Sequence, residues 1–183
     1  MTDIWLVRHG EAAVAFDQNI DPPLSDLGRE QATKSAKYLS RCVPEDAQIL
    51  TSPKLRAIQT GEPFSASRQR ALDIDFRFIE LPSPEALTER KDWIQRVLKG
   101  RWGELPESVH AWQGDVVEAI QRLQAPTVIF SHFLVINVVA AHMSGEDAVL
   151  QCMPANGSVH HLRTEEGSWE WIERGEMLQS LVN

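Results

Sequence analysis

The stretch Ile4–Glu11, with the sequence IWLVRHGE, decides the fold, because an apolar run here ends in charged and imidazole side chains. Four consecutive apolar residues are typical of a strand that is covered on both faces. Neighbouring side chains of a strand point to opposite faces, so Arg8 and His9 converge only where regular strand geometry stops. Gly10 is expected to allow this stop, because glycine tolerates backbone angles that other residues avoid. An imidazole beside a guanidinium at such a strand end suggests a nucleophile next to an anion clamp.

A second apolar run, Ala47–Thr51, passes into Ser52, Pro53 and Arg56. Serine before proline predicts a helix start, with Ser52 as the N-cap and Pro53 at the first helical position. The positive end of this helix would lie at the carboxyl end of the strand and favour an anion. Arg56, one turn further on, is expected to reach back toward the same point.

A third apolar run, Pro126–Phe130, ends at Ser131 and His132 and leads into another apolar stretch. Open α/β sheets bind ligands at the carboxyl ends of their strands. Each polar residue alone has an ordinary structural explanation, but three strand ends of this kind together favour a functional site. The side chains expected to meet at this edge of the sheet are Arg8, His9, Arg56 and His132.

Composition and charge are those of a globular protein. The chain has 183 residues, 43% of them hydrophobic and 24% charged, with no repeat or linker, so residues 1–183 are predicted to form a single domain. The net charge of −8 argues against nucleic acid and anionic membranes as partners. The longest apolar stretch, residues 133–141, is too short to span a bilayer. Cys42 and Cys152 form no Cys-x-x-Cys pair, which favours a reduced, cytoplasmic location.

Strand-like and helix-like segments alternate between the three runs. The predicted elements are helices over Ser25–Arg41, Pro53–Ser67 and Glu107–Leu123, a short strand over Phe76–Leu81, and a hairpin of residues 158–164 and 168–174 around Glu165–Gly167. Alternation with a late hairpin predicts an α/β fold, a three-layer α/β/α sandwich with a mostly parallel central sheet and an antiparallel edge strand.

Four motifs occur in order along the chain. They are RHGE at Arg8–Glu11, PLSDLGREQA at Pro23–Ala32, the Ser52-Pro53 pair followed by Arg56, Ala57 and Thr60, and the Ser131-His132 pair. In this order and at this spacing they resemble the histidine phosphatase superfamily, the phosphoglycerate mutase-like group. The resemblance spans roughly residues 4–164, nearly the whole chain.

The resemblance implies a phosphomonoesterase that acts on a small phosphorylated metabolite without a metal or a cofactor. His9 would attack phosphorus and form a phosphohistidine, and the nearby Arg8 and Arg56 should lower its pKa so that it stays neutral. Arg8, Arg56 and His132 would bind the non-bridging oxygens, with bidentate arginine contacts setting the geometry. His132 is therefore expected to act both in catalysis and in phosphate binding.

The leaving oxygen needs a proton, and the resemblance implies a glutamate in the segment after the central strand. Glu80 is our candidate, although it leads into Leu81–Pro84 where the family usually has a glycine-rich Trp-Glu-Gly stretch. The alternatives are Asp75, Glu85 and Glu62. Glu11 is expected to orient His9 or to brace the turn.

Two departures from mutase-like members favour a phosphatase. Ala15 stands where many members have asparagine, which weakens the case for a cofactor-dependent phosphoglycerate mutase. Phe133 follows the second histidine where glycine is common, which should narrow the pocket. The chain is also short for a mutase, which must protect phosphohistidine from water.

Residues 82–107 carry tryptophans and basic residues and, by the resemblance, would form a small helical lid over the mouth of the site. The ordinary alternative is a helix that packs its tryptophans and exposes its charges.

The rivals to the favoured phosphatase are a cofactor-dependent phosphoglycerate mutase, a phosphohistidine protein phosphatase and a non-catalytic module that binds phosphorylated ligands. Small bacterial phosphohistidine protein phosphatases share the short chain and the Pro-Leu-Ser segment. A non-catalytic module that binds phosphorylated partners would use the same pocket but would not need a nucleophile. A zinc site on His9, His132, His160 and His161 is less favoured, because adjacent residues of a strand face opposite ways.

Overall fold

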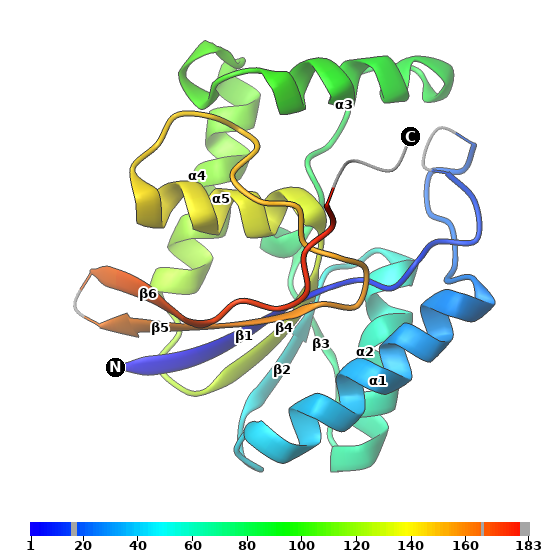
Figure 1. The fold of residues 1–183 in the computed structure, drawn as a ribbon, viewed down its shortest axis with the longest axis vertical. Coiled ribbons are helices and arrows are strands. Elements are labelled where there is room, and N and C mark those ends of the chain that lie inside the picture. The colour runs from blue at the N-terminus through cyan, green and yellow to red at the C-terminus, as the bar shows by residue number, and fades with distance from the viewer. Residues whose placement is uncertain (16–17, 166, 180–183) are drawn as a thin grey trace.

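The computed structural model describes residues 1–15, 18–165 and 167–179, which form a three-layer α/β/α sandwich (Figure 1). Within these residues six strands make one mixed sheet in the order β3-β2-β4-β1-β5-β6. The first four strands of this order are parallel to one another. The strand β5 pairs antiparallel with β1, and β6 pairs antiparallel with β5. The strands are β1 (Thr2–Arg8), β2 (Gln48–Thr51), β3 (Asp73–Ile74), β4 (Thr127–Ser131), β5 (Val159–Glu165) and β6 (Ser168–Glu173). The predicted fold class is confirmed.

Two helices cover each face of the sheet, and α3 lies outside these layers (Figure 1). The pair on one face is α1 (Asp26–Cys42) and α2 (Leu55–Arg68), and the pair on the other is α4 (Glu107–Gln121) and α5 (Phe133–Ser144). The segment predicted as a lid holds α3 (Arg90–Lys99) between two short 3-10 helices, Leu87–Glu89 and Trp102–Glu104. No helix of the described residues is long and apolar enough to cross a membrane.

The strand β1 is apolar at every central position because it contributes to two cores. Ile4 and Leu6 pack with α4 and α5, whereas Trp5 and Val7 pack with α1 and α2. All four side chains are buried. Successive side chains of a strand point to opposite faces, so a strand that is covered on both faces buries every side chain and favours apolar residues at each position.

The sheet order brings the carboxyl ends of β1, β4 and β2 together. β4 lies between the other two, with Arg8 opposite Ser131 and Thr51 opposite Phe130. The backbone hydrogen bonds to β4 continue past the ends of β1 and β2. The Ser131 carbonyl accepts from the His9 amide at 2.9 Å, and the Phe130 carbonyl accepts from the Ser52 amide at 2.9 Å. The three polar strand ends of the sequence are therefore immediate neighbours.

The prediction of a strand over Phe76–Leu81 was wrong. Residues Phe76–Phe78 form a 3-10 helix, and the edge strand β3 comes earlier, at Asp73–Ile74. The Asp75 carboxylate caps this helix by accepting from the Arg77 amide at 3.0 Å. Phe78 is buried while Phe76 is 71% exposed, so the apparent alternation reflects a turn and not a pleated strand. The C-terminal hairpin was predicted correctly as β5 and β6, although Glu166 in its turn lies outside the described residues.

Candidate active site

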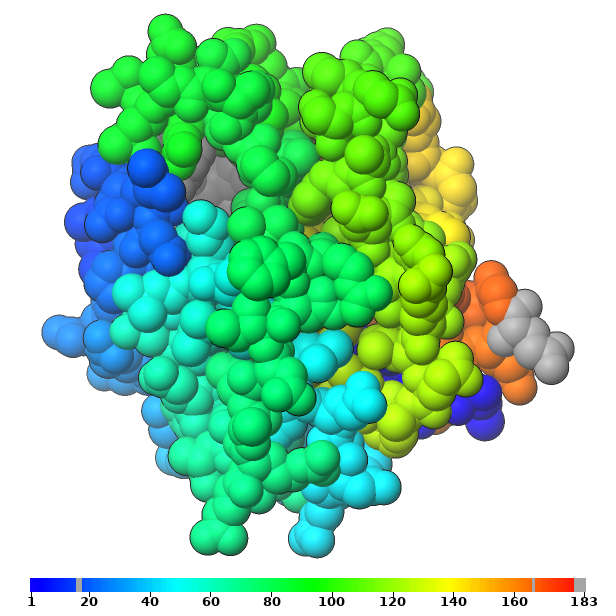
Figure 2. All heavy atoms as spheres, turned by 180° about the vertical axis from the view of Figure 1, so that it is seen from behind, coloured from blue at the N-terminus to red at the C-terminus, as the bar shows by residue number. Residues whose placement is uncertain are grey.

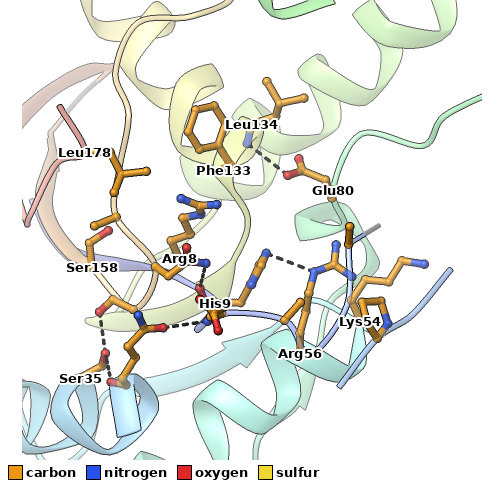
Figure 3. A pocket seen from close by; sticks show the side chains of 18 of the residues that line it. Arg8, His9, Ser35, Lys54, Arg56, Glu80, Phe133, Leu134, Ser158 and Leu178 are labelled. Atoms are coloured by element: carbon orange, nitrogen blue, oxygen red, sulfur yellow. Dashed lines mark hydrogen bonds between the residues drawn. The ribbon is translucent and has the colours of Figure 1, made fainter. Parts of the chain in front are cut away.

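A cavity of about 1530 Å³ lies at the carboxyl ends of the central strands. Its lining includes Arg8 and His9 from the end of β1, Arg56 from α2, and Glu80 (Figure 3). Phe133 and Leu134 from the start of α5 and four residues of α3 complete one side. Figure 2 shows a recess on the surface between the N-terminal segment and the green segment that carries α3.

His9 is 9% exposed and has both ring nitrogens engaged. Its Nδ1 lies 2.7 Å from the Gly10 carbonyl, and its Nε2 accepts from Arg56 Nε at 3.1 Å. Because the guanidinium can only donate, the proton of the neutral ring belongs on Nδ1 and the lone pair on Nε2. Burial lowers the pKa of His9 well below its ordinary value, and the positive charges of Arg56 and Arg8 lower it further. The ring is thus a neutral base with its lone pair on the cavity side.

The turn after His9 needs glycine for space and not for backbone angles. Gly10 does not have a positive φ, so the predicted reason for this residue was wrong. A Cβ at Gly10 would collide with the carbonyl oxygen of Gly28, and a Cβ at Gly28 would collide with the carbonyl oxygen of Glu11. The Gly10 amide donates to Thr60 Oγ1 at 3.0 Å. The absence of side chains at the two glycines lets α1 approach the strand end closely. This close packing and the hydrogen bond to Thr60 fix the backbone next to His9.

Arg8 is held by one contact and keeps a free donor. Its Nη1 donates to the Pro154 carbonyl at 2.6 Å, and its guanidinium carbon lies 5.0 Å from the centre of the Phe133 ring. Its buried Nε has no hydrogen-bond partner among the described residues. Burial is the main cause that lowers the pKa of Arg8 to about 10, which leaves it cationic at neutral pH. A buried guanidinium with an unused donor is suited to an anion.

Arg56 links the two histidines of the site. Its Nη2 lies 3.4 Å from His132 Nδ1, in addition to the bond from its Nε to His9 (Figure 3). Its buried Nη1 lies 3.8 Å from the Asp21 carboxylate and makes no hydrogen bond within the described part of the chain. Arg56, in the first turn of α2, reaches back to the strand ends as expected.

Ser52 is not the N-cap of α2, contrary to the prediction. The helix begins at Leu55 after Lys54, and the Ser52 hydroxyl lies 2.7 Å from His132 Nε2. His132 is fully buried and, unlike His9 and Arg56, does not line the cavity, although its ring centre lies 5.2 Å from that of His9. Burial and the charge of Arg56 lower the pKa of His132 well below its ordinary value. A serine that follows β2 therefore forms a hydrogen bond with the second histidine of the site.

Glu80 faces the same cavity from the segment that follows the 3-10 helix. Its Oε1 accepts from the Leu81 amide at 3.1 Å, and its Oε2 accepts from the Leu134 amide at 3.4 Å, in the first turn of α5 (Figure 3). Burial raises the pKa of Glu80 above its ordinary value, although Arg56 and Arg8 act in the opposite direction. A carboxyl group with a raised pKa is suited to donate a proton.

The other acidic candidates do not line the cavity. Asp75 is paired with Arg77, Glu85 lies 3.9 Å from Arg96, and Glu62 is exposed on α2. Glu11 lines the cavity and braces the turn, since its carboxylate accepts from the Ser25 hydroxyl at 2.7 Å.

Two residues of the site were not anticipated from the sequence. Asp21 accepts from the Leu55 amide at 2.9 Å and so occupies the start of α2, where an anion was expected. Asn156 donates from its side chain to the His9 carbonyl at 3.2 Å, and the Gly157 amide donates to the Arg8 carbonyl at 3.0 Å. The Asp21-Pro22-Pro23 and Asn156-Gly157 turns were the available signals, but a turn signal does not say which strand end the turn will contact.

The four histidines of the rival zinc hypothesis do not converge. His160 contacts the Ser158 hydroxyl at 2.8 Å, whereas His161 contacts Asp3 at 2.8 Å on the other face of β5. Within the described residues, no group of three or more His, Cys, Asp or Glu side chains is arranged to hold a metal ion.

One comparison with known proteins identifies the family. A family model described as histidine phosphatase superfamily (branch 1) matches residues 4–176. A comparison with curated sequences gives no significant match.

Solved structures share the fold at low sequence identity. A putative alpha-ribazole-5'-P phosphatase from Escherichia coli matches with a TM-score of 0.75 and 21% identity, covering 96% of this chain and 96% of that chain. Phosphoserine phosphatase from Entamoeba histolytica, in complex with 3-phosphoglyceric acid, matches with a TM-score of 0.74 and 18% identity, covering 97% and 98%. A mycobacterial glucosyl-3-phosphoglycerate phosphatase matches with a TM-score of 0.69 and 20% identity, covering 92% and 96%.

Proposed function

The chain belongs to the histidine phosphatase superfamily, and on this premise we propose that it is a phosphomonoesterase that works through a phosphohistidine at His9. The observation that carries the proposal is the neutral His9 Nε2 lying beside two guanidinium groups, each with a buried donor that has no hydrogen-bond partner among the described residues. A nucleophile between two cations is what attack on a dianionic phosphate ester requires. Structural neighbours named as phosphatases support this class of reaction.

In the first step His9 Nε2 would form a bond to phosphorus while the bond from phosphorus to the ester oxygen breaks. Glu80, whose raised pKa favours the protonated form, would give its proton to the leaving oxygen. In the second step water would attack phosphorus, the bond to His9 would break, and the Glu80 carboxylate would take the proton from water. Inorganic phosphate and the alcohol are the products, and both residues return to their starting states.

The arginines would bind the transferred group. Arg8 Nε and Arg56 Nη1 are the donors without hydrogen-bond partners in the described residues, and each would donate to a non-bridging oxygen. Arg56 Nε would turn from His9 Nε2 to the phosphate, which frees the lone pair for attack. No step of this scheme requires a metal or a cofactor, so we propose metal-independent turnover.

His132 would contribute a third donor. It contacts Arg56 through Nδ1 and Ser52 through Nε2. A serine hydroxyl can donate or accept, so Ser52 can hold the His132 proton on either nitrogen. With Ser52 donating to Nε2, Nδ1 carries the proton and can donate to the phosphate once Arg56 has turned.

The test is hydrolysis of a panel of phosphate monoesters, including an aryl phosphate, with EDTA present. We expect the parent protein to release phosphate and His9→Ala to lose this activity, while His142→Ala, an exposed histidine on α5, retains it. Brief reaction followed by alkaline quenching should trap a base-stable, acid-labile phosphohistidine. If the parent hydrolyses no ester but dephosphorylates a phosphohistidine protein, and Glu80→Gln leaves that activity unchanged, the phosphohistidine protein phosphatase replaces the proposal.

A further inference from the structure

We propose that the substrate carries an apolar organic group, aromatic or long alkyl, which binds against one side of the cavity. This apolar wall consists of Ile79, Leu81, Phe133, Trp93, Ile94 and Leu98. The inference rests on the proposed function, because it uses the positions of the nucleophile and the proton donor to place the leaving group.

The direction of the leaving group follows from the reaction. In phosphoryl transfer the attacking and leaving oxygen or nitrogen atoms lie roughly in line through phosphorus. His9 Nε2 attacks from the strand end, and Glu80 must reach the leaving oxygen to protonate it. The organic group therefore extends from phosphorus on the side of Glu80, toward α5 and α3. Figure 3 shows Glu80 beside Leu134 and Phe133 on this side of the pocket.

Three of the residues next to Glu80 on the side of α5 and α3 are apolar. Ile79 and Leu81 flank it in sequence, and Leu134 contacts it through its backbone amide. Two polar backbone groups of this region are already used: the Ile79 carbonyl accepts from Trp112 Nε1 at 2.9 Å, and the Leu81 amide donates to Glu80. An organic group rich in hydroxyl groups would lose its hydration here and find few equivalent partners.

The lid segment completes the apolar wall. The helix α3 contributes Trp93, Ile94 and Leu98 to the lining, with Arg90 as its one charged residue there. A guanidinium on such a wall is compatible with an aromatic ring, since arginine stacks on aromatic faces. The cavity volume of about 1530 Å³ exceeds the range of about 300–1,000 Å³ common for small-molecule pockets. There is room for a bulky group beyond the phosphate.

Apart from Glu80 and Glu11, the carboxylates of the cavity lie on elements other than α3 and α5. Glu30 comes from α1, Glu173 from the end of β6, and Glu176 from the segment that follows it. Lys34, on α1, lies 3.8 Å from Glu176. This acidic side disfavours a second anionic group on the substrate, and the apolar wall offers the favourable alternative.

The experiment compares n-alkyl phosphates with ethyl, butyl and hexyl chains against 3-phosphoglycerate. The three alcohols have similar leaving-group basicity, so differences in kcat/KM report binding of the chain and not intrinsic reactivity. We expect kcat/KM to rise by up to about fourfold for each added CH2, which is the factor expected for its burial. Hexyl phosphate should then exceed ethyl phosphate by up to roughly 250-fold if all four added CH2 groups are buried, and it should exceed 3-phosphoglycerate by more than about tenfold, the gain expected from only two buried CH2 groups.

Variants locate the effect. Trp93→Ala and Leu98→Ala should lower the ratio of kcat/KM for hexyl over ethyl phosphate by several-fold, because each removes part of the apolar wall. The matched control is Trp169→Ala, a half-buried tryptophan on β6 that packs on His142 away from the cavity. It should leave the ratio unchanged.

The outcomes separate the two proposals. Turnover that requires His9 but does not rise with chain length, or that is faster for 3-phosphoglycerate, would overturn the apolar substrate and leave the phosphatase intact. A chain-length effect that persists in both α3 variants would also overturn the assigned wall. Absence of turnover on every ester, or turnover that His9→Ala retains, would contradict both the proposed phosphatase activity and the proposed apolar substrate.

Discussion

Arg56 donates its Nε–H to His9 Nε2 over 3.1 Å, so the atom that would attack phosphorus is hydrogen-bonded before any substrate arrives. The same contact fixes the ring tautomer, because Nδ1 then donates to the Gly10 carbonyl at 2.7 Å. A cation held against the ring also disfavours its protonation, in the same direction as burial. Arg56 thus keeps the nucleophile neutral and oriented, and substrate binding would draw the guanidinium away from it.

The first prediction concerns Arg56→Lys. An ammonium group retains the charge but cannot donate to His9, His132 and a phosphate in the fixed pattern of a guanidinium. We expect kcat/KM to fall by about 10²–10³, the loss associated with one transition-state donor. Steady-state kinetics measure this, with Arg41→Lys on the exposed end of α1 as the control. An activity of Arg56→Lys within twofold of the parent would contradict the role of the guanidinium.

The second prediction concerns pH. Glu80 acts as an acid only while protonated, and burial raises its pKa, so kcat/KM for an alkyl phosphate should fall as pH rises through that raised value. His9 stays neutral to well below pH 6.5, so its protonation should not reduce activity between pH 7 and 6. Glu80→Gln should reduce kcat/KM by about 100-fold or more and abolish the fall.

The substrate also ionises as the pH changes, but it does so equally with both proteins. The ratio of parent to Glu80→Gln therefore isolates the carboxyl group. An aryl phosphate, whose leaving group needs less help, should show a smaller loss. A ratio that does not change with pH would argue against Glu80 as the acid.

The sheet was predictable because its central strands are buried on both faces. The runs that became β1, β2 and β4 are mostly apolar, and a polar pair ends each where the strand leaves the core. The edge strand β3 has only two residues and is exposed, so burial left no pattern to detect. The alternation in Phe76–Leu81 misled because a capped 3-10 helix also places one large side chain inside and the next outside.

The reacting groups were predictable for a similar reason, since parallel neighbouring strands bring their ends together whatever their loops do. His9, Arg8 and Arg56 meet as expected. The supporting contacts were not predictable, because Asp21, Ser52 and Asn156 act across long sequence separations. Ser52 shows the limit most clearly, because its local sequence favours an N-cap while the tertiary structure gives its hydroxyl to His132.

The third prediction uses two glycines that both lie in helices. Gly28→Ala would force a Cβ into the Glu11 carbonyl, so we expect a loss of about 1–3 kcal/mol in the free energy of unfolding and a lower kcat from the displaced His9 turn. Gly114→Ala on α4 meets nothing within 4 Å and should gain about 0.5–1 kcal/mol with unchanged activity. Urea unfolding and kinetics on both proteins measure this. Equal effects from the two substitutions would show that the approach of α1 to the strand end is not tight.

The fourth prediction concerns the stability of the folded chain at acid pH. His160 is buried between β5 and the segment after β6, with Nδ1 accepting from the Gly175 amide at 3.1 Å and Nε2 lying 2.8 Å from the Ser158 hydroxyl. Protonation would place an N–H against the Gly175 N–H, in agreement with a pKa that burial, and then Arg174, lower to about 4. The folded chain therefore keeps this ring neutral where an unfolded chain would protonate it.

Above pH 6.5 His160 is neutral in both states and adds no pH dependence. Between pH 6.5 and about 4 only the unfolded chain binds the proton, so the free energy of unfolding should fall by about 1.4 kcal/mol per pH unit from this residue. His160→Gln should remove that contribution, while His9 and His132, whose pKa values are also lowered, keep theirs. Urea unfolding at pH 7 and pH 5 should show the parent losing about 2 kcal/mol more than the variant. An equal loss in both proteins would mean that His160 takes up its proton without unfolding, and the segment after β6 would then have to open first.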